Sequence, residues 1–142
     1  MQNSAKIEKR LLQGAVVLAC LVPIAGGGLG VLEGLGLVGV AAASASAEAH
    51  FRYLSGLLLG IGLGFLGMVP RIAAHSARFR LLAAIVVIGG LARLASLALR
   101  ETADAATLFA LVMELGVTPL LALWQWRVSR AARWLGTGAP RD

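Results

Sequence analysis

The chain has few of the residues on which soluble domains, metal centres and disulfide frameworks depend. Its one cysteine, Cys20, cannot form an internal disulfide. Its two histidines, His50 and His75, lie far apart without a second thiol or an acid pair beside them, so no metal site is predicted. Charged residues make up 14% of the chain, against about 25% in soluble domains. These shortages argue against a soluble metalloenzyme or a secreted disulfide scaffold.

Apolar residues dominate instead, at 58% of the chain with a mean hydropathy of +0.83. A length of 142 residues suits about four membrane spans of roughly 20 residues with short connections. We therefore predict an all-α integral membrane four-helix bundle that forms a single transmembrane domain over residues 1–142. The net charge of +6 does not indicate nucleic acid, because the basic residues lie between apolar runs and not on one solvated face. The lipid bilayer is the expected partner.

The predicted spans are residues 11–32, 49–69, 81–99 and 105–126, followed by a basic tail over residues 127–142. Residues 34–47, rich in Gly, Ala and Ser, fit an interfacial loop, a short helix or an extension of the first span, and periodicity does not decide. Ala45 to Ala47 resembles a signal-peptidase site. The apolar stretch before it is longer than the roughly 7–15 residues of a secretory signal, so we expect the first span to remain.

Glycine recurs every fourth residue in the first two spans, a spacing that lets helices approach closely. The two predicted ridges are Gly26, Gly30 and Gly34, and Gly56, Gly60 and Gly64. Proline interrupts the first and the fourth span at Pro23 and Pro119, where we expect bends. Because Pro119 has no backbone N–H, the carbonyl of Leu115 should lack its usual hydrogen bond within the helix.

Charge is distributed unevenly over the connections. With four spans, the start, the second connection and the tail share one side of the membrane, which then carries ten of the thirteen basic residues. The opposite side carries Glu33, Glu48, Glu101 and Asp104. The positive-inside rule therefore predicts that both termini are cytoplasmic. After the fourth span, Arg127, Arg130 and Arg133 could form a basic surface helix, although stop-transfer charges are the favoured interpretation.

Three residues with a formal charge lie inside the apolar spans: Arg52, Arg93 and Glu114. An unpaired carboxylate in hydrocarbon costs several kcal/mol, so we predict an ion pair between Arg93 and Glu114. Arg52 is expected above it, near Glu48. At about 1.5 Å per residue, all three lie in the outer half of the membrane. With the polar residues on the same helix faces, they form a candidate ligand site that opens outward: Arg52, Ser55, Arg93, Ser96, Glu114 and Thr118.

Three segments together resemble a family: HFRYLSGLLLGIGLGF from His50, GGLARLASL from Gly89 and MELGVTPLLALWQ from Met113. They are similar to a family of small four-span bacterial membrane proteins known only as a domain of unknown function. The resemblance covers about Ile7 to Arg130 and implies a location in the bacterial inner membrane. The layout is more distantly similar to DoxX-like four-helix proteins, some of which accompany quinone-linked oxidoreductases.

The sequence supports three functional hypotheses. The first is a binding or accessory protein whose outward pocket holds a lipid-like or quinone-like amphiphile. The second is a structural or assembly subunit, in a homo-oligomer or a larger membrane complex, in which the charges fix the helices. The third is a membrane enzyme or proton-coupled transporter that uses Glu114. No catalytic group and no cofactor is predicted, because no serine or cysteine has a well-placed base.

Overall fold

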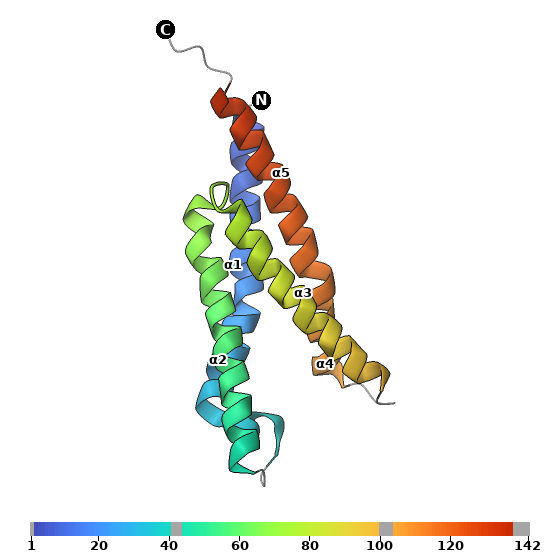
Figure 1. The fold of residues 1–142 in the computed structure, drawn as a ribbon. Coiled ribbons are helices and arrows are strands. Elements are labelled where there is room, and N and C mark those ends of the chain that lie inside the picture. Colours follow the sequence, from blue (N-terminus) through green and yellow to red (C-terminus); the bar gives the residue numbers. More distant parts are fainter. Residues whose placement is uncertain (1, 41–43, 100–103, 138–142) are drawn as a thin grey trace. The chain divides into compact units, whose positions relative to one another are not determined.

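The computed structural model describes residues 2–40, 44–99 and 104–137, and these ranges contain helices and no strand (Figure 1). In chain order the elements are α1 (Gln2–Glu33), η1 (Gly34–Val38), α2 (Ala45–Met68), η2 (Val69–Arg71), α3 (Ser76–Ala98), α4 (Ala105–Leu111), η3 (Val112–Val117) and α5 (Thr118–Thr137). The elements η1 and η2 are 3₁₀ helices, whereas η3 is a π-helix.

Four helical segments are long and apolar enough to cross a membrane: Asn3–Val38, Ala45–Arg71, Ser76–Ala98 and Ala105–Trp134. A helix satisfies its own backbone hydrogen bonds, which is why an apolar run without water around it adopts this form. The prediction of an all-α chain with four membrane-spanning helices is confirmed. The chain is a multi-pass membrane protein.

Some connections are shorter than the sequence suggests. The helix α3 begins at Ser76, so Arg78 and Arg80, expected in a loop, lie in its first turns. Residues 34–38 form the short helix η1, and α2 already begins at Ala45. The helix α5 runs on to Thr137, so the basic residues after the fourth span continue that helix and do not form a separate surface helix. Glu101 lies outside the described residues.

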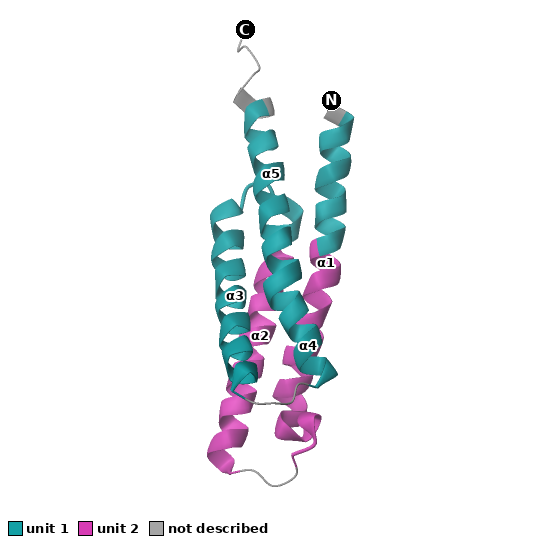
Figure 2. Cartoon of the chain, turned by 90° about the vertical axis from the view of Figure 1, so that its right-hand side faces the viewer, with its two compact units in different colours: residues 1–15, 68–142 teal, residues 16–67 magenta. Residues whose placement is uncertain are grey.

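The chain divides into two compact units, coloured separately in Figure 2. Unit 2 comprises residues 16–67, which hold most of α1, η1 and most of α2. Unit 1 comprises residues 1–15 and 68–142, which hold the start of α1 and all elements from η2 onward. Each unit is described by itself below.

In unit 2, α1 and α2 run antiparallel and touch through glycines. A Cβ atom at Gly27 would lie 2.5 Å from the backbone nitrogen of Leu59, and one at Gly30 would lie 2.8 Å from Cβ of Ser55. Gly26 and Gly60 have open space where their side chains would be. The ridge predicted at Gly26, Gly30 and Gly34 is therefore shifted, because the face that meets α2 contains Gly27 in place of Gly26.

In unit 1, α3 runs antiparallel to the long helix formed by α4, η3 and α5. The core near its α5 end contains Leu12, Ile72, Phe79 and Val128, which are at most 6% exposed. Gln13 Nε2 donates to the carbonyl of Val69 at 2.7 Å, which ties the start of α1 to the connection after α2.

These contacts gather three segments at one end of unit 1. We call this the basic end and define it as residues 2–15, 68–80 and 120–137. By sequence it carries nine lysine and arginine residues and one acid, Glu8. Glu8 Oε1 pairs with Nε of Arg127 at 3.2 Å.

Candidate functional site

The predicted ion pair between Arg93 and Glu114 is present in unit 1. Arg93 Nε donates to Oε2 of Glu114 and Nη2 donates to Oε1, both at 3.0 Å, so the pair is bidentate. The side chain of Glu114 is 17% exposed and that of Arg93 is 42% exposed. This contact uses two of the five N–H donors of a guanidinium. Arg93 can therefore hold the carboxylate and still donate to another acceptor.

A π-helical segment positions Glu114. Val112 to Val117 form η3, and both the amide and the hydroxyl of Thr118 donate to the carbonyl of Met113, the hydroxyl at 2.8 Å. Pro119 follows directly. In an α-helix its ring would clash with the carbonyl four residues earlier, and a π-helical turn relieves that clash. The disturbance expected from Pro119 thus takes the form of a π-helix that contains Glu114.

Close approach of two backbones brings α3 to this segment. Gly90 is buried, and a Cβ atom there would lie 2.8 Å from Cβ of Glu114 and 2.8 Å from Cδ2 of Leu115. Gly90 and Arg93 are three residues apart and therefore share a helix face. The absent side chain at Gly90 lets the guanidinium of Arg93 reach a carboxylate on the facing helix.

Asp104 caps the helix that leads to Glu114. Its Oδ1 accepts from the amide of Thr107 at 2.6 Å at the N-terminus of α4. Hydrogen bonds from the hydroxyl and the amide of Thr107 lower the pKa of Asp104 below that of an ordinary carboxyl, and the charge of Arg93 acts in the same direction. The start of the fourth span is therefore fixed by an ionised cap.

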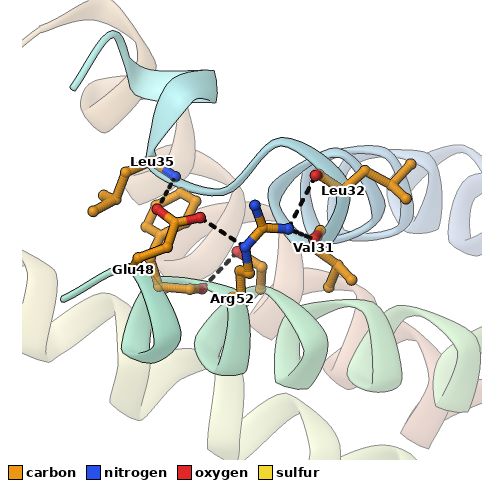
Figure 3. Close-up of polar contacts among 7 residues, drawn as sticks. Val31, Leu32, Leu35, Glu48 and Arg52 are labelled. Atoms are coloured by element: carbon orange, nitrogen blue, oxygen red, sulfur yellow. Dashed lines mark hydrogen bonds and ion pairs between the residues drawn. The ribbon is translucent and has the colours of Figure 1, made fainter. Parts of the chain in front are cut away.

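Arg52, in unit 2, has a different set of partners (Figure 3). Its Nη1 donates to the carbonyls of Val31 and Leu32 in the last turn of α1, and its Nε donates to Oε1 of Glu48 at 2.7 Å. The other carboxylate oxygen of Glu48 accepts from the amide of Leu35 at 3.0 Å. Arg52 and Glu48 together close the C-terminal end of α1, whose last carbonyls lack partners within the helix.

Gly34 is required at this helix end. Its φ of 62° is in the left-handed region, where a Cβ atom is unfavourable. A Cβ atom there would also lie 2.6 Å from the carboxyl carbon of Glu48 and 2.8 Å from Nη2 of Arg52. Glycine lets the chain turn out of α1 while the two charged side chains approach its backbone. The proximity of Arg52 to Glu48 is confirmed, whereas the capping role was not predicted.

The hydroxyl residues of the predicted site have separate surroundings. Ser55 is buried, donates to the carbonyl of Phe51 at 2.8 Å and lies against Gly30 in unit 2. Thr118 bonds within its own helix, as described above. Ser96 is exposed, one turn beyond Arg93 on α3. Of the six predicted residues, the structure pairs Arg93 with Glu114, and the proposal that all six share one pocket stays a prediction.

A second polar cluster in unit 1 was missed at the sequence level. Gln125 is fully buried, and its Nε2 donates to the carbonyl of Ile72 at 2.7 Å. It also lies 3.0 Å from Oγ of Ser76 and 2.8 Å from Oγ of Ser129. Gln125 lies in the predicted fourth span, over residues 105–126, but the partner carbonyl on a distant segment has no local sequence signal. This cluster joins α5 to the start of α3.

Among the described residues, no group of three or more histidine, cysteine, aspartate or glutamate side chains is placed to hold a metal ion. The polar contacts of the described residues include the Arg93–Glu114 and Arg52–Glu48 pairs, the Glu8–Arg127 pair at the basic end and the amide cluster at Gln125. An arginine whose described hydrogen bonds leave donors unused beside a carboxylate suits a neutral or anionic hydrogen-bond acceptor.

Comparison with known proteins agrees with the expected resemblance to a family of unknown function, whereas the bacterial origin and the DoxX-like layout stay predictions. No curated protein and no solved structure matches the chain. The model of one family, described as domain of unknown function DUF4345, matches residues 11–125. The match covers most of the membrane-spanning helices and includes the residues of the Arg52–Glu48 and Arg93–Glu114 pairs. The chain belongs to the DUF4345 family.

Proposed function

We propose that this chain is a small binding or accessory protein of the bacterial inner membrane that holds the polar head of a lipid-like or quinone-like amphiphile at Arg93. The observation that carries the proposal is the bidentate Arg93–Glu114 pair, in which the Arg93 side chain is 42% exposed and its described hydrogen bonds use two of five N–H donors. Glu114 balances the charge, so the site does not require an anionic ligand. Carbonyl or phosphate oxygens of an amphiphile fit it.

The location of the pair supports a ligand that enters from the membrane. Both residues lie within helices long and apolar enough to span a bilayer. Ionisable residues at such positions commonly mark ligand or ion sites. The basic end, with nine lysine and arginine residues, suits the cytoplasm, and this orientation places Arg93 and Glu114 in the outer half of the membrane. The distant likeness to DoxX-like proteins fits a quinone-like ligand and remains a prediction.

Ser96 and Thr118 are the hydroxyl residues proposed to complete the site at Arg93. Ser96 is exposed on the same helix. The hydroxyl of Thr118 donates within its helix, but its oxygen can still accept a hydrogen bond. Arg52 and Ser55 are weaker candidates, because their described hydrogen bonds serve the end of α1 and the packing of α2.

The test is mass spectrometry of the protein purified in mild detergent, followed by identification of extracted amphiphiles. We expect a co-purifying molecule that the Arg93→Leu variant loses by about tenfold or more, as is typical when a charged hydrogen-bond donor is removed. The matched control is Arg80→Leu, the same change on the same helix, α3. Equal retention in both variants, or no bound molecule in the unmodified protein, would refute the proposal.

One observation favours a second candidate, a structural or assembly subunit. The Arg52–Glu48 pair caps the end of α1, so at least one intramembrane charge pair in this chain has an architectural role. Under this alternative Arg93 and Glu114 lock two helices in the same manner. Crosslinking in native membranes separates the two candidates: a stoichiometric partner that persists in the Arg93→Leu variant supports the subunit role.

A further inference from the structure

The basic end of unit 1 contains a hollow that the proposed function does not use. Its volume is about 320 Å³, near the lower limit of ligand pockets and suited to a head group more than to a whole lipid. Lys6, Glu8 and Lys9 from the start of α1 line one wall. The remaining lining is small and apolar: Ala5, Ala73, Val128, Ala131 and Ala132.

The charges around this hollow are not equivalent. Glu8 pairs with Arg127 at 3.2 Å, and the guanidinium of Arg130 stacks over Trp126 at 4.7 Å from the ring centroid. Lys6 and Lys9 form no ion pair with the other described residues. They lie three residues apart and so share one face of α1. The hollow therefore has two unpaired ammonium groups at its edge and an apolar floor.

The sequence around the hollow indicates a depth at the level of lipid head groups. The charge-free run of the first span begins at Leu11, directly after Lys6, Lys9 and Arg10. With about 1.5 Å per residue, the two lysines lie within about 10 Å of the start of the hydrocarbon. A negatively charged head group at this level would meet the ammonium groups, while its glycerol and first methylenes would meet the alanines.

We propose that this hollow is a binding site for an anionic glycerophospholipid of the phosphatidylglycerol type, with its phosphate on Lys6 and Lys9. Charge complementarity selects the ligand, because the basic end carries nine basic residues and a single acid that is already paired. The small side chains of Ala73, Ala131 and Ala132 leave room for the glycerol. The site is independent of Arg93 and lies on a different part of unit 1.

The experiment measures lipid binding to the full-length protein in detergent by native mass spectrometry, with phosphatidylglycerol and phosphatidylcholine of equal chain length. We expect the unmodified protein to prefer phosphatidylglycerol. The Lys6→Gln/Lys9→Gln variant should lose about 25-fold in affinity, since each basic residue near an anionic head group contributes a factor of about five. The matched control, Arg78→Gln/Arg80→Gln, removes the same charge from the same end but not from the hollow, and should retain the preference.

A second variant tests the hollow without changing any charge. Ala132→Phe fills the floor at an exposed position and should also abolish the preference for phosphatidylglycerol. This variant keeps the proposal testable if the double lysine variant does not fold.

Equal losses in the lysine variant and the arginine control would overturn the proposal in favour of general surface charge. Displacement of the lipid by millimolar glycerol phosphate would overturn it in favour of a free-phosphate site. The Arg93→Leu variant should bind phosphatidylglycerol as the unmodified protein does. A failure of the lipid proposal is therefore distinguishable from a failure of the proposed function at Arg93.

Discussion

At the scale of single residues, Gly90 controls how closely α3 approaches the segment that contains Glu114. The Gly90→Ala variant should be destabilised by about 1–3 kcal/mol, because its Cβ atom would lie 2.8 Å from both Glu114 and Leu115. Gly89→Ala is the matched control, since nothing lies within 4 Å of a Cβ atom there, and should be neutral or stabilising by up to about 1 kcal/mol. Thermal unfolding in detergent measures both, and equal effects would contradict the close contact.

The Arg93–Glu114 pair should show strong energetic coupling. In a double-mutant cycle of Arg93→Met and Glu114→Gln, each single change leaves a polar partner without its counterpart in a poorly solvated site. We expect a coupling free energy of about 1–3 kcal/mol, with the double variant more stable than the sum of the single changes predicts. Additive effects in chemical denaturation would show that the pair does not stabilise the contact between α3 and η3.

The sequence was sufficient to predict this pair and insufficient to predict Gly90. Glu114 lies in a long apolar stretch and needs a cation, and Arg93 is at a matching depth on the preceding span, so the pairing follows from energy alone. Gly89 and Gly90 are adjacent, and only the rotation of α3 decides which of them faces η3. That rotation depends on the packing of two whole helices, which local sequence does not encode.

At the scale of secondary structure, the end of α1 depends on α2. Arg52→Met removes the donors to the carbonyls of Val31 and Leu32 and the partner of Glu48. We expect the last turn of α1 to exchange its amide hydrogens roughly tenfold faster, as for the loss of a charged hydrogen bond. Arg52→Lys should give an intermediate rate, because an ammonium group lacks the planar fork. Hydrogen exchange with mass spectrometry measures this, and an unchanged rate would exclude the capping role.

The start of α4 should respond to acid. Hydrogen bonds from Thr107 lower the pKa of Asp104 in the folded chain, so its ionised cap stabilises the helix at pH values above the ordinary carboxyl pKa. This contribution is lost as the pH falls through the lowered pKa. We expect the protection factor of the Thr107 amide to decrease on acidification.

The Asp104→Asn variant is the control for this titration. Asparagine caps helices but does not ionise in this range, so the protection factor of the same amide should become independent of pH. NMR on the protein in micelles measures the protection factor of the Thr107 amide in the unmodified protein and in the variant. An identical acid response in the variant would assign the effect to another group.

Helix ends were harder to predict than helix cores. Pro119 predicts a bend in the fourth helix, because the loss of its amide donor and the ring clash are local properties; the structure shows a π-helix just before it. The disturbance takes the form of a π-helix from Val112 to Val117. The hydroxyl of Thr118, which donates to the carbonyl of Met113 together with the amide, also contributes to this form. The capping role of Arg52 can be predicted only if α2 is known to begin a few residues after Val40. The composition of residues 34–47 does not decide where that helix begins.

At the scale of the whole molecule, the distribution of charge predicts the orientation in the membrane. Unit 1 ties the start of α1, the connection after α2 and the second half of α5 to one basic end through the Gln13–Val69, Glu8–Arg127 and Gln125–Ile72 contacts. A four-span chain requires these segments to lie on the same side, so contacts and topology agree. Moving them across the membrane would require translocation of nine basic residues.

The orientation can be tested with single cysteines introduced into a Cys20→Ser background and a maleimide that does not cross membranes. Asn3→Cys, at the exposed start of α1, should react only after the cells are lysed, whereas Ala45→Cys, at the exposed start of α2, should react in intact spheroplasts. The two positions flank the first span, so they must respond in opposite ways if that span crosses the bilayer. The reverse pattern would place Arg93 and Glu114 in the cytoplasmic half and would require the amphiphile to enter from that leaflet.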